Sequence, residues 1–235
     1  MKLLAIDSSS KTASVAFLYD NKLISESYVD IGLTHSQTLL PLIKNTLENS
    51  HTSINEIDAF AINNGPGSFT GVRIGISLIK GLAFFESKPC IPVSTLHSLA
   101  YNLINTDCIA CPVMDARCNQ VYNAIFRIND KKIERLTDDR AISIDDLLTE
   151  LKENYNEKII FVGDGADLCY NKCNNKNLSI VDNSIKYQLA KSTAYIALDF
   201  LKMGNFVDPD KLLPSYIRLP QAQRLLNKKK ETFDE

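Results

Sequence analysis

Residues 64–75 read Asn-Gly-Pro-Gly-Ser-Phe-Thr-Gly-Val-Arg-Ile-Gly and lie between two apolar segments. Glycine and proline in such a position indicate a tight turn, and we predict a strand before it and a helix after it. Backbone N–H groups at a strand-to-helix turn can bind an anion. However, the glycines are spaced one residue too far apart for a dinucleotide-binding motif, and the chain has no Gly-Lys pair for a Walker loop. A purely structural turn, with Ser68 or Thr70 capping the helix, is the alternative.

Working outward from this turn, apolar runs and turn residues predict the remaining elements. In the first half we expect strands at 3–8, 13–19, 23–29, 58–63 and 90–93, and helices at 35–48, 70–86 and 95–104. In the second half we expect strands at 110–115, 121–128, 132–136, 158–162 and 178–181, and helices at 143–155, 166–172 and 188–203. Each half therefore has the same order of elements, which predicts a duplicated α/β architecture. We place one domain at 1–106, a second at 107–222 and a polar tail at 223–235.

The helices predicted at 35–48 and 70–86 carry more apolar surface than packing on one sheet requires. Apolar residues cover more than half the circumference of the second helix, whereas a stripe of about 100° is enough for a sheet face. In the first helix the apolar arc also includes His35. We therefore expect these helices to meet a protein partner.

Composition excludes several classes of protein. The 235 residues are 45% hydrophobic and 23% charged, with a net charge of −2, so no overall basic field favours nucleic acid. No apolar run is long enough to span a bilayer, and Asp7 interrupts the first apolar run too early for a secretory signal. Six cysteines without such a signal are typical of a reducing compartment. We expect a cytoplasmic protein that does not bind membranes.

Metal binding has little support in the spacing of histidine and cysteine. The histidines, at 35, 51 and 97, form none of the helical pairs that bind metals. Cys108 and Cys111 form a C-x-x-C pair, and Cys169 and Cys173 lie nearly 60 residues further on. A zinc site from these four is conceivable, but we expect buried thiols and no metal.

Asp7 and Asp115 end corresponding strands of the two halves. Paired carboxylates at strand ends are where a duplicated α/β fold would hold a metal–nucleotide complex. The alternative is that both acids cap turns. The chain has no G-x-S-x-G elbow to support nucleophilic catalysis.

Several motifs together resemble the TsaB (YeaZ) family, the accessory subunits of bacterial tRNA threonylcarbamoyladenosine synthesis. The resemblance extends from residue 1 to about 222, and its most specific part is the turn and helix at 65–75. The matching motifs are Asp7-Ser-Ser, His35-Ser-Gln followed by Leu-Leu-Pro-Leu-Ile, Gly65 to Gly75, Met114-Asp-Ala-Arg117, Gln120-Val-Tyr122 and Pro214-Ser-Tyr-Ile-Arg218.

The resemblance implies a duplicated actin-like ATPase (ribonuclease H-like) fold in two lobes. It implies that the chain pairs with a TsaD-type transferase, helps to recruit a TsaE-type ATPase and forms a homodimer when alone. Contact with tRNA would be only indirect. In TsaD a histidine pair binds a metal, and because this sequence has no such pair, the implied role is non-catalytic. The chain would need no cofactor of its own, and ATP or ADP would bind at the interface of the complex.

The same resemblance assigns site residues. The family pairs through first-lobe helices, and Gln37 here replaces the usual Glu, which weakens any acid–base or metal role at that position. The expected interface residues are His35, Leu39, Leu42, Ile43, Val72, Ile76 and Ile79. The family-motif positions in loops and at strand ends are Asp7, Gly65, Gly67, Gly71, Arg73, Asp115 and Arg117.

Two other functions remain open at this stage. Sugar and acetate kinases share the implied fold, so a phosphotransferase is one alternative, because a fold does not determine a function. The other is a peptidase, since relatives have carried a glycoprotease label, although the missing histidine pair speaks against it.

Overall fold

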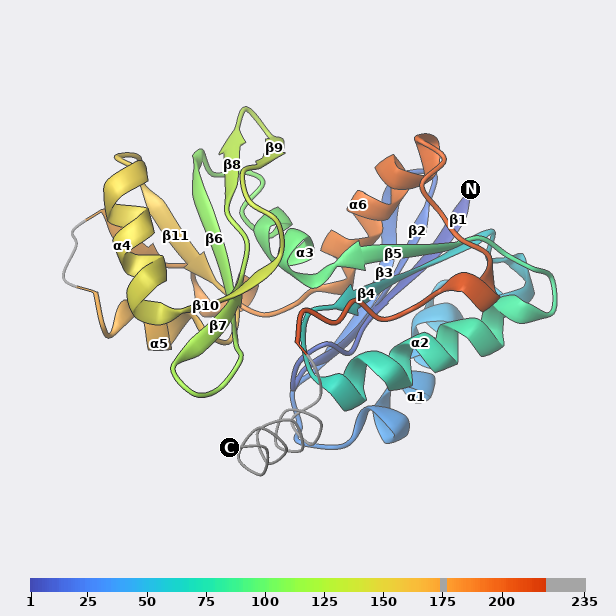
Figure 1. Cartoon of the computed structure of the whole chain (residues 1–235). Helices are drawn as coiled ribbons and strands as arrows, with labels where there is room; N and C mark the ends of the chain where they lie inside the picture. The colour runs from blue at the N-terminus through green and yellow to red at the C-terminus, as the bar shows by residue number, and fades with distance from the viewer. Residues whose placement is uncertain (174–176, 219–235) are drawn as a thin grey trace, which may run out of the picture.

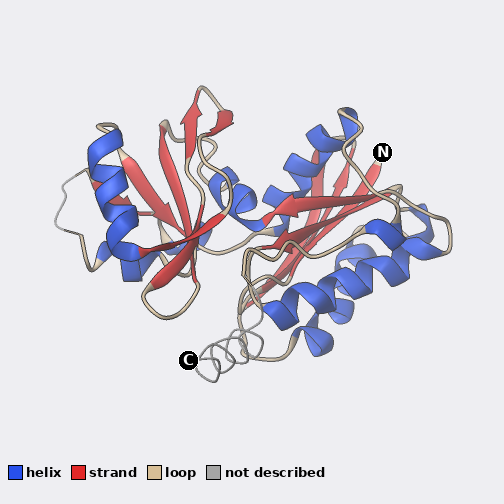
Figure 2. Ribbon diagram, viewed as in Figure 1, coloured by secondary structure: helices blue, strands red, loops and turns tan. Residues whose placement is uncertain are grey.

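A computed structural model describes residues 1–173 and 177–218 of the chain. In these residues the strands form two sheets, each at the centre of one lobe, with helices on the faces of the sheets (Figures 1 and 2). The α/β class and the two-lobed duplication predicted from the sequence are confirmed. Among the same residues, none of the helices combines the length and the apolar character that crossing a bilayer demands.

The first sheet has the strand order β3-β2-β1-β4-β5. Its strands are β1 (Lys2–Asp7), β2 (Ala13–Tyr19), β3 (Lys22–Val29), β4 (Ala59–Gly65) and β5 (Cys90–Ser94). β1, β2 and β3 are antiparallel neighbours, as their short links predict, and β4 and β5 run parallel to β1. Side chains on both faces of β1 are buried, because helices cover both sides of this sheet.

Helices from distant parts of the chain cover the first sheet. α1 (His35–Asn49) and α2 (Phe69–Phe84) pack on one face, and α6 (Ala190–Lys202) packs on the other (Figure 1). Leu212, beyond α6, is also fully buried in the core under α1 and α2. Residues 190–216 therefore contribute to the first lobe, in contrast to the second domain predicted at 107–222, because their small and apolar side chains fit the uncovered face and edge of the first sheet.

The second sheet has the order β10-β7-β6-β11-β12, and β8 pairs with β6 and β9. Its strands are β6 (Cys108–Asp115), β7 (Gln120–Asn123), β8 (Phe126–Asn129), β9 (Lys132–Arg135), β10 (Arg140–Ser143), β11 (Ile159–Val162) and β12 (Leu178–Ile180). The strand predicted at 121–128 is divided in two, because the Asn123 side chain turns inward and donates to the carbonyls of Pro112 and Ala124. β10 was not predicted from the sequence.

The remaining helices complete the second lobe and its links. α3 (Thr95–Tyr101) packs on one face of the second sheet, and α4 (Ile144–Asn154) and α5 (Ala166–Tyr170) pack on the other. Short 3-10 helices are η1 (Ile54–Glu56), η2 (Asn183–Ile185) and η3 (Pro209–Lys211). The polar tail predicted at 223–235, and the last residues of the predicted second domain, lie outside the described residues.

Candidate functional site

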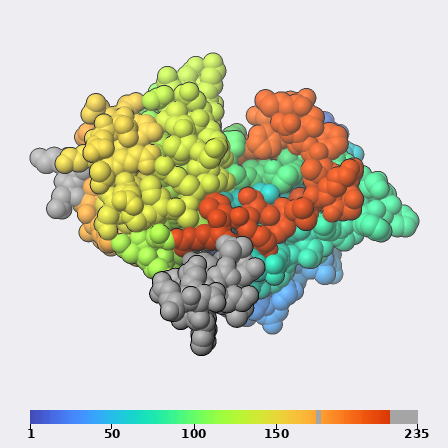
Figure 3. Space-filling model, in the orientation of Figure 1, coloured from blue at the N-terminus to red at the C-terminus, as the bar shows by residue number. Residues whose placement is uncertain are grey.

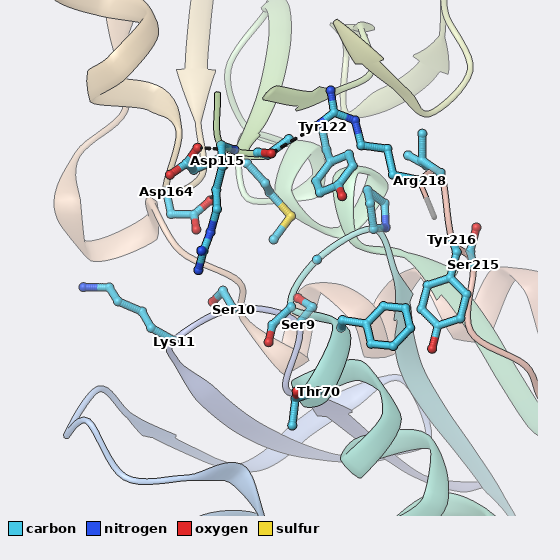
Figure 4. Close-up of a pocket in the computed structure, with 18 residues that line it drawn as sticks. Ser9, Ser10, Lys11, Thr70, Asp115, Tyr122, Asp164, Ser215, Tyr216 and Arg218 are labelled. Atoms are coloured by element: carbon cyan, nitrogen blue, oxygen red, sulfur yellow. Dashed lines mark hydrogen bonds between the residues drawn. The ribbon is translucent and has the colours of Figure 1, made fainter. Parts of the chain in front are cut away.

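A cleft of about 610 Å³ separates the lobes, and segments of both lobes line it (Figure 4). The turn after β1 contributes Ser9, Ser10 and Lys11, and the loop and first turn of α2 contribute residues 66–70. The second lobe contributes residues 114–117, Tyr122 and Asp164, and residues 215–218 form another wall. Hydroxyls, basic groups and carboxylates thus face one space between the lobes.

The glycine-rich turn packs against the turn after β1. A Cβ at Gly67 would overlap the carbonyl oxygen of Ser9, and a Cβ at Gly71 would overlap that of Ser8. The Ser68 amide donates to the Ser9 carbonyl at 2.6 Å, and the Ser68 hydroxyl caps α2 by accepting from the Gly71 amide. Because the Ser68 amide already has a partner, the structural interpretation of this turn fits better than anion binding.

Gly65 leaves room for the C-terminal segment to pack directly against the end of β4. Its backbone has φ +128°, in the region that favours glycine, and a Cβ there would overlap the Ser215 carbonyl oxygen. The Ser215 amide donates to the Asn64 carbonyl at 2.7 Å. The glycines of the motif at 65, 67 and 71 therefore serve close packing of three segments.

Asp7 does not line the cleft. Its carboxylate is fully buried and accepts from the Ser9 hydroxyl at 2.7 Å and from the Asn63 amide at 2.6 Å. Burial raises the pKa of this carboxyl, and the hydrogen bonds oppose the rise. Of the two roles that the sequence leaves open for Asp7 and Asp115, turn capping fits Asp7, because its carboxylate accepts from the Ser9 amide and hydroxyl. The turn at Ser8–Ser10 closes over Asp7, so it does not share the cleft with Asp115.

Asp115 does line the cleft, next to an acid that sequence reasoning missed. Its own amide donates to Asp164 at 3.3 Å, and its carboxylate accepts from the Arg117 amide at 2.7 Å. Burial, together with the nearby Asp115 carboxylate, raises the pKa of Asp164 to about 6. The sequence carries a signal for it: Asp164 lies two residues beyond the end of β11, which runs parallel to β6, and the carboxyl ends of parallel strands meet at one edge of a sheet.

Arg73 and Arg117 occupy different surroundings. The Arg73 guanidinium lies 3.9 Å from the centre of the Phe69 ring, and its Nε–H donates to the Tyr216 hydroxyl at 2.6 Å. Arg117 is exposed at the cleft, in a hairpin where its backbone has φ +62°. Arg73 thus holds the C-terminal segment, whereas Arg117 faces the space between the lobes.

The structure buries three of the four cysteines that the sequence predicts to be buried thiols. Cys108, Cys111 and Cys169 are buried, and Cys173 is half-buried. Burial raises the pKa of the Cys169 thiol to about 12, so the thiol is protonated at neutral pH. Within residues 1–173 and 177–218, no three His, Cys, Asp or Glu side chains form a group that could hold a metal ion.

The predicted interface residues face the interior of their own lobe. Leu39, Leu42, Ile43, Val72, Ile76 and Ile79 all belong to the buried core between the first sheet and its helices. His35 also turns inward, and its Nε2–H donates to the Ser10 carbonyl at 2.8 Å. Apart from Ile43, which also lines the edge of an exposed groove, the prediction of a docking surface made of these side chains is wrong, because a helical wheel shows which residues share a face but not which face meets the sheet.

Other residues of the same helices are exposed. A groove of about 590 Å³ lies beside α1, and its lining is almost entirely apolar. The lining residues are Leu40, Pro41, Ile43, Lys44, Leu47, Glu48, Thr52, Ile54 and Leu82. Leu40 is 55% exposed, and at the end of α2 Phe84 and Phe85 are 72% and 93% exposed. We call the surface formed by Leu40, Pro41, Leu82, Phe84 and Phe85 the α1–α2 face.

Comparison with known proteins agrees with the sequence resemblance. The family model described as "TsaD: tRNA N6-adenosine threonylcarbamoyltransferase" matches residues 31–224. The tRNA threonylcarbamoyladenosine biosynthesis protein TsaB of Bacillus subtilis is 30% identical over 95% of this chain and 96% of its own. The TsaB protein of Escherichia coli is 30% identical over 93% of this chain and 95% of its own. The solved structure of YeaZ from Pseudomonas aeruginosa has the same fold, with a TM-score of 0.79 and 24% identity over 92% of this chain and 99% of that one.

Proposed function

The chain belongs to the TsaB family of tRNA threonylcarbamoyladenosine biosynthesis proteins, and from that premise we propose that it is the non-catalytic partner of a TsaD-type transferase. Its role lies in the synthesis of threonylcarbamoyladenosine in tRNA. By docking, it would hold the transferase in the conformation that transfers threonylcarbamoyl to the adenosine beside the anticodon. It would touch tRNA only indirectly.

The observation that carries this proposal is the α1–α2 face. An exposed leucine at an apolar groove, with two exposed phenylalanines at the end of the neighbouring helix, is costly in water and typical of a protein interface. A partner that resembles the TsaD family shares the fold of this chain, since the model of that family matches residues 31–224. Equivalent helices of the two proteins could then pack against each other as a pseudo-symmetric pair.

The mechanism we propose is a shift of conformational population. A partner that binds only the competent form of the transferase raises the fraction of that form by its difference in affinity for the two forms. The α1–α2 face would form the interface of a homodimer when no transferase is present. The TsaE-type ATPase would bind where both partners contribute surface, with ATP or ADP at that interface and none required by this chain alone.

The experiment measures threonylcarbamoyladenosine in bulk tRNA by mass spectrometry after depletion of this protein in its host. We expect the modification to disappear while the threonylcarbamoyl adenylate is still made. A wild-type copy and a Leu168→Asp copy should restore it, because Leu168 is an exposed leucine of the second lobe. A Leu40→Asp copy should not. Unchanged modification after depletion would contradict the proposal.

A phosphotransferase is the second candidate, and the observation that favours it is the pair of acids in the cleft. Asp115 and Asp164 lie at the ends of parallel strands, where a fold of this type holds nucleotides. Turnover of ATP by the isolated chain, lost on Asp115→Asn, would support this function. Equal background hydrolysis by both proteins would exclude it.

A further inference from the structure

The segment at residues 212–218, which we call the strap, crosses from one lobe to the other along the wall of the cleft. It leaves η3 on the first lobe and ends beside the hairpin between β6 and β7 on the second (Figure 1). In the space-filling view its red surface lies between the lobes (Figure 3). Four of its residues, 215–218, line the cleft.

The strap is held to the first lobe at several points. Leu212 is fully buried in the core under α1 and α2. Asn64, at the end of β4, receives the Ser215 amide on its carbonyl, and its side-chain amide donates to the Leu213 carbonyl at 3.2 Å. Tyr216 stacks on Phe69 with 4.5 Å between ring centres. Backbone, core and aromatic contacts therefore all anchor this end.

Within the described residues, the strap makes fewer contacts with the second lobe. The Arg218 Nη1–H donates to the Ala116 carbonyl at 3.1 Å, and its guanidinium lies 6.0 Å from the centre of the Tyr122 ring. Ala116 itself is buried in the β6–β7 hairpin, next to Asp115. Figure 4 shows Arg218 beside Tyr122, with Tyr216 below it on the same strap.

The short stretch of chain between Tyr216 and Arg218 limits how far the two lobes can separate. Only Ile217 lies between Tyr216 and Arg218, and a fully extended chain spans at most about 7 Å over these two steps. The Ala116 hairpin cannot move far from the Phe69 ring while both contacts hold. Opening the cleft requires one of them to break, and Arg218 has the fewer contacts.

We propose that the strap is a latch that sets the opening of the cleft between the lobes, with Arg218 as its releasable end. While the latch is closed, Tyr216 and Arg218 form a wall and hold the lobes at a fixed separation. When Arg218 leaves the Ala116 carbonyl, the lobes separate and the cleft opens to larger solutes. This inference concerns the chain alone and does not depend on the proposed partner.

The test is a distance measurement between the lobes by double electron–electron resonance. Spin labels are attached to cysteines introduced at Ser77 on α2 and Lys152 on α4, both of which are exposed. Cys118 and Cys173 are replaced by serine, which leaves only cysteines that are buried. Circular dichroism melts of each variant establish that it is folded before its distances are compared.

We expect a narrow distance distribution for the parent protein and a broader one with a longer mean for Arg218→Ala. Tyr216→Ala should broaden the distribution less, because Leu212 and the backbone bonds between Ser215 and Asn64 still anchor that end of the strap. The matched control is Arg127→Ala, which removes an exposed arginine paired with Glu134 and Glu157 within the second lobe and should leave the distribution unchanged. A folded Arg218→Ala protein with the distribution of the parent would overturn the proposal.

Discussion

Adjacent leucines on α1 provide a test of which side of the helix is available to a partner. Leu39 is 1% exposed and packs in the core of the first lobe, whereas Leu40 is 55% exposed beside the apolar groove. We expect Leu39→Asp to unfold the protein and Leu40→Asp to leave it folded but to weaken its pairing with the transferase. The two variants make the same chemical change at consecutive positions.

The difference in burial between Leu39 and Leu40 sets the expected losses of folding stability. Removing a buried leucine side chain costs about 2–5 kcal/mol, and an unpaired carboxylate in its place costs several more. Since a typical domain is stable by about 5–15 kcal/mol, Leu39→Asp removes most or all of the stability. At Leu40 more than half of the side chain is already in water, so the loss should stay near 1 kcal/mol. If Leu40 lies at the centre of the interface, its loss should weaken pairing by about 2 kcal/mol or more, roughly 30-fold.

Urea denaturation and titration against the purified transferase measure the two effects separately. Leu168→Asp, on the second lobe, is the control for an added charge at an exposed leucine. A Leu40→Asp protein that pairs with wild-type affinity would refute the assignment of the α1–α2 face. A Leu39→Asp protein with an unchanged urea midpoint would show that the core is not packed as described.

Three further predictions follow from individual side chains. Because the pKa of Asp164 is about 6 in the folded chain and ordinarily 3.8, the folded state keeps a proton that the unfolded state loses between about pH 4 and 6. The free energy of unfolding should therefore fall as pH rises through that window, by at most about 3 kcal/mol. The urea midpoint of Asp164→Asn should depend less steeply on pH than that of the parent protein, and an equal pH dependence would contradict this. In α2, Gly71→Ala should lower the melting temperature because its Cβ overlaps the Ser8 carbonyl, whereas Gly81→Ala, with open space around it, should raise stability by up to about 1 kcal/mol; equal effects at both sites would contradict the packing. Cys118 is exposed and should react with a thiol reagent in the native protein well before the buried cysteines, which should need denaturant; simultaneous reaction would contradict their burial.

Much of the fold could be predicted from the order of residues. Apolar periodicity and turn residues depend on near neighbours in the chain, so the strand at Ala59–Gly65 and the helix at Phe69–Phe84 were located to within a few residues. The glycine-rich turn and the segment at 214–218 also indicated the family. By contrast, β10 is four residues long and half-buried throughout, and such a segment has no alternation to detect.

The site depended on contacts between residues far apart in the chain. Sequence reasoning left open whether Asp7 and Asp115, which end corresponding strands, share one site or cap turns. In the structure Asp7 is enclosed by its own turn, and Asp164 lies beside Asp115 instead. Sequence reasoning also could not decide whether Tyr216 and Arg218 hold a partner or their own chain. In the structure Tyr216 binds the first lobe and Arg218 the second.

Local chemistry thus accounts for the order of helices and strands, for the duplicated architecture and for the family of this protein. Tertiary packing alone decided that α6 of the second half covers the first sheet and that Leu39 is inside while Leu40 is outside. The physical reason is that a helix with apolar residues around most of its circumference can bury more than one face. Which face it buries depends on the shape of the sheet and of the other elements packed around it.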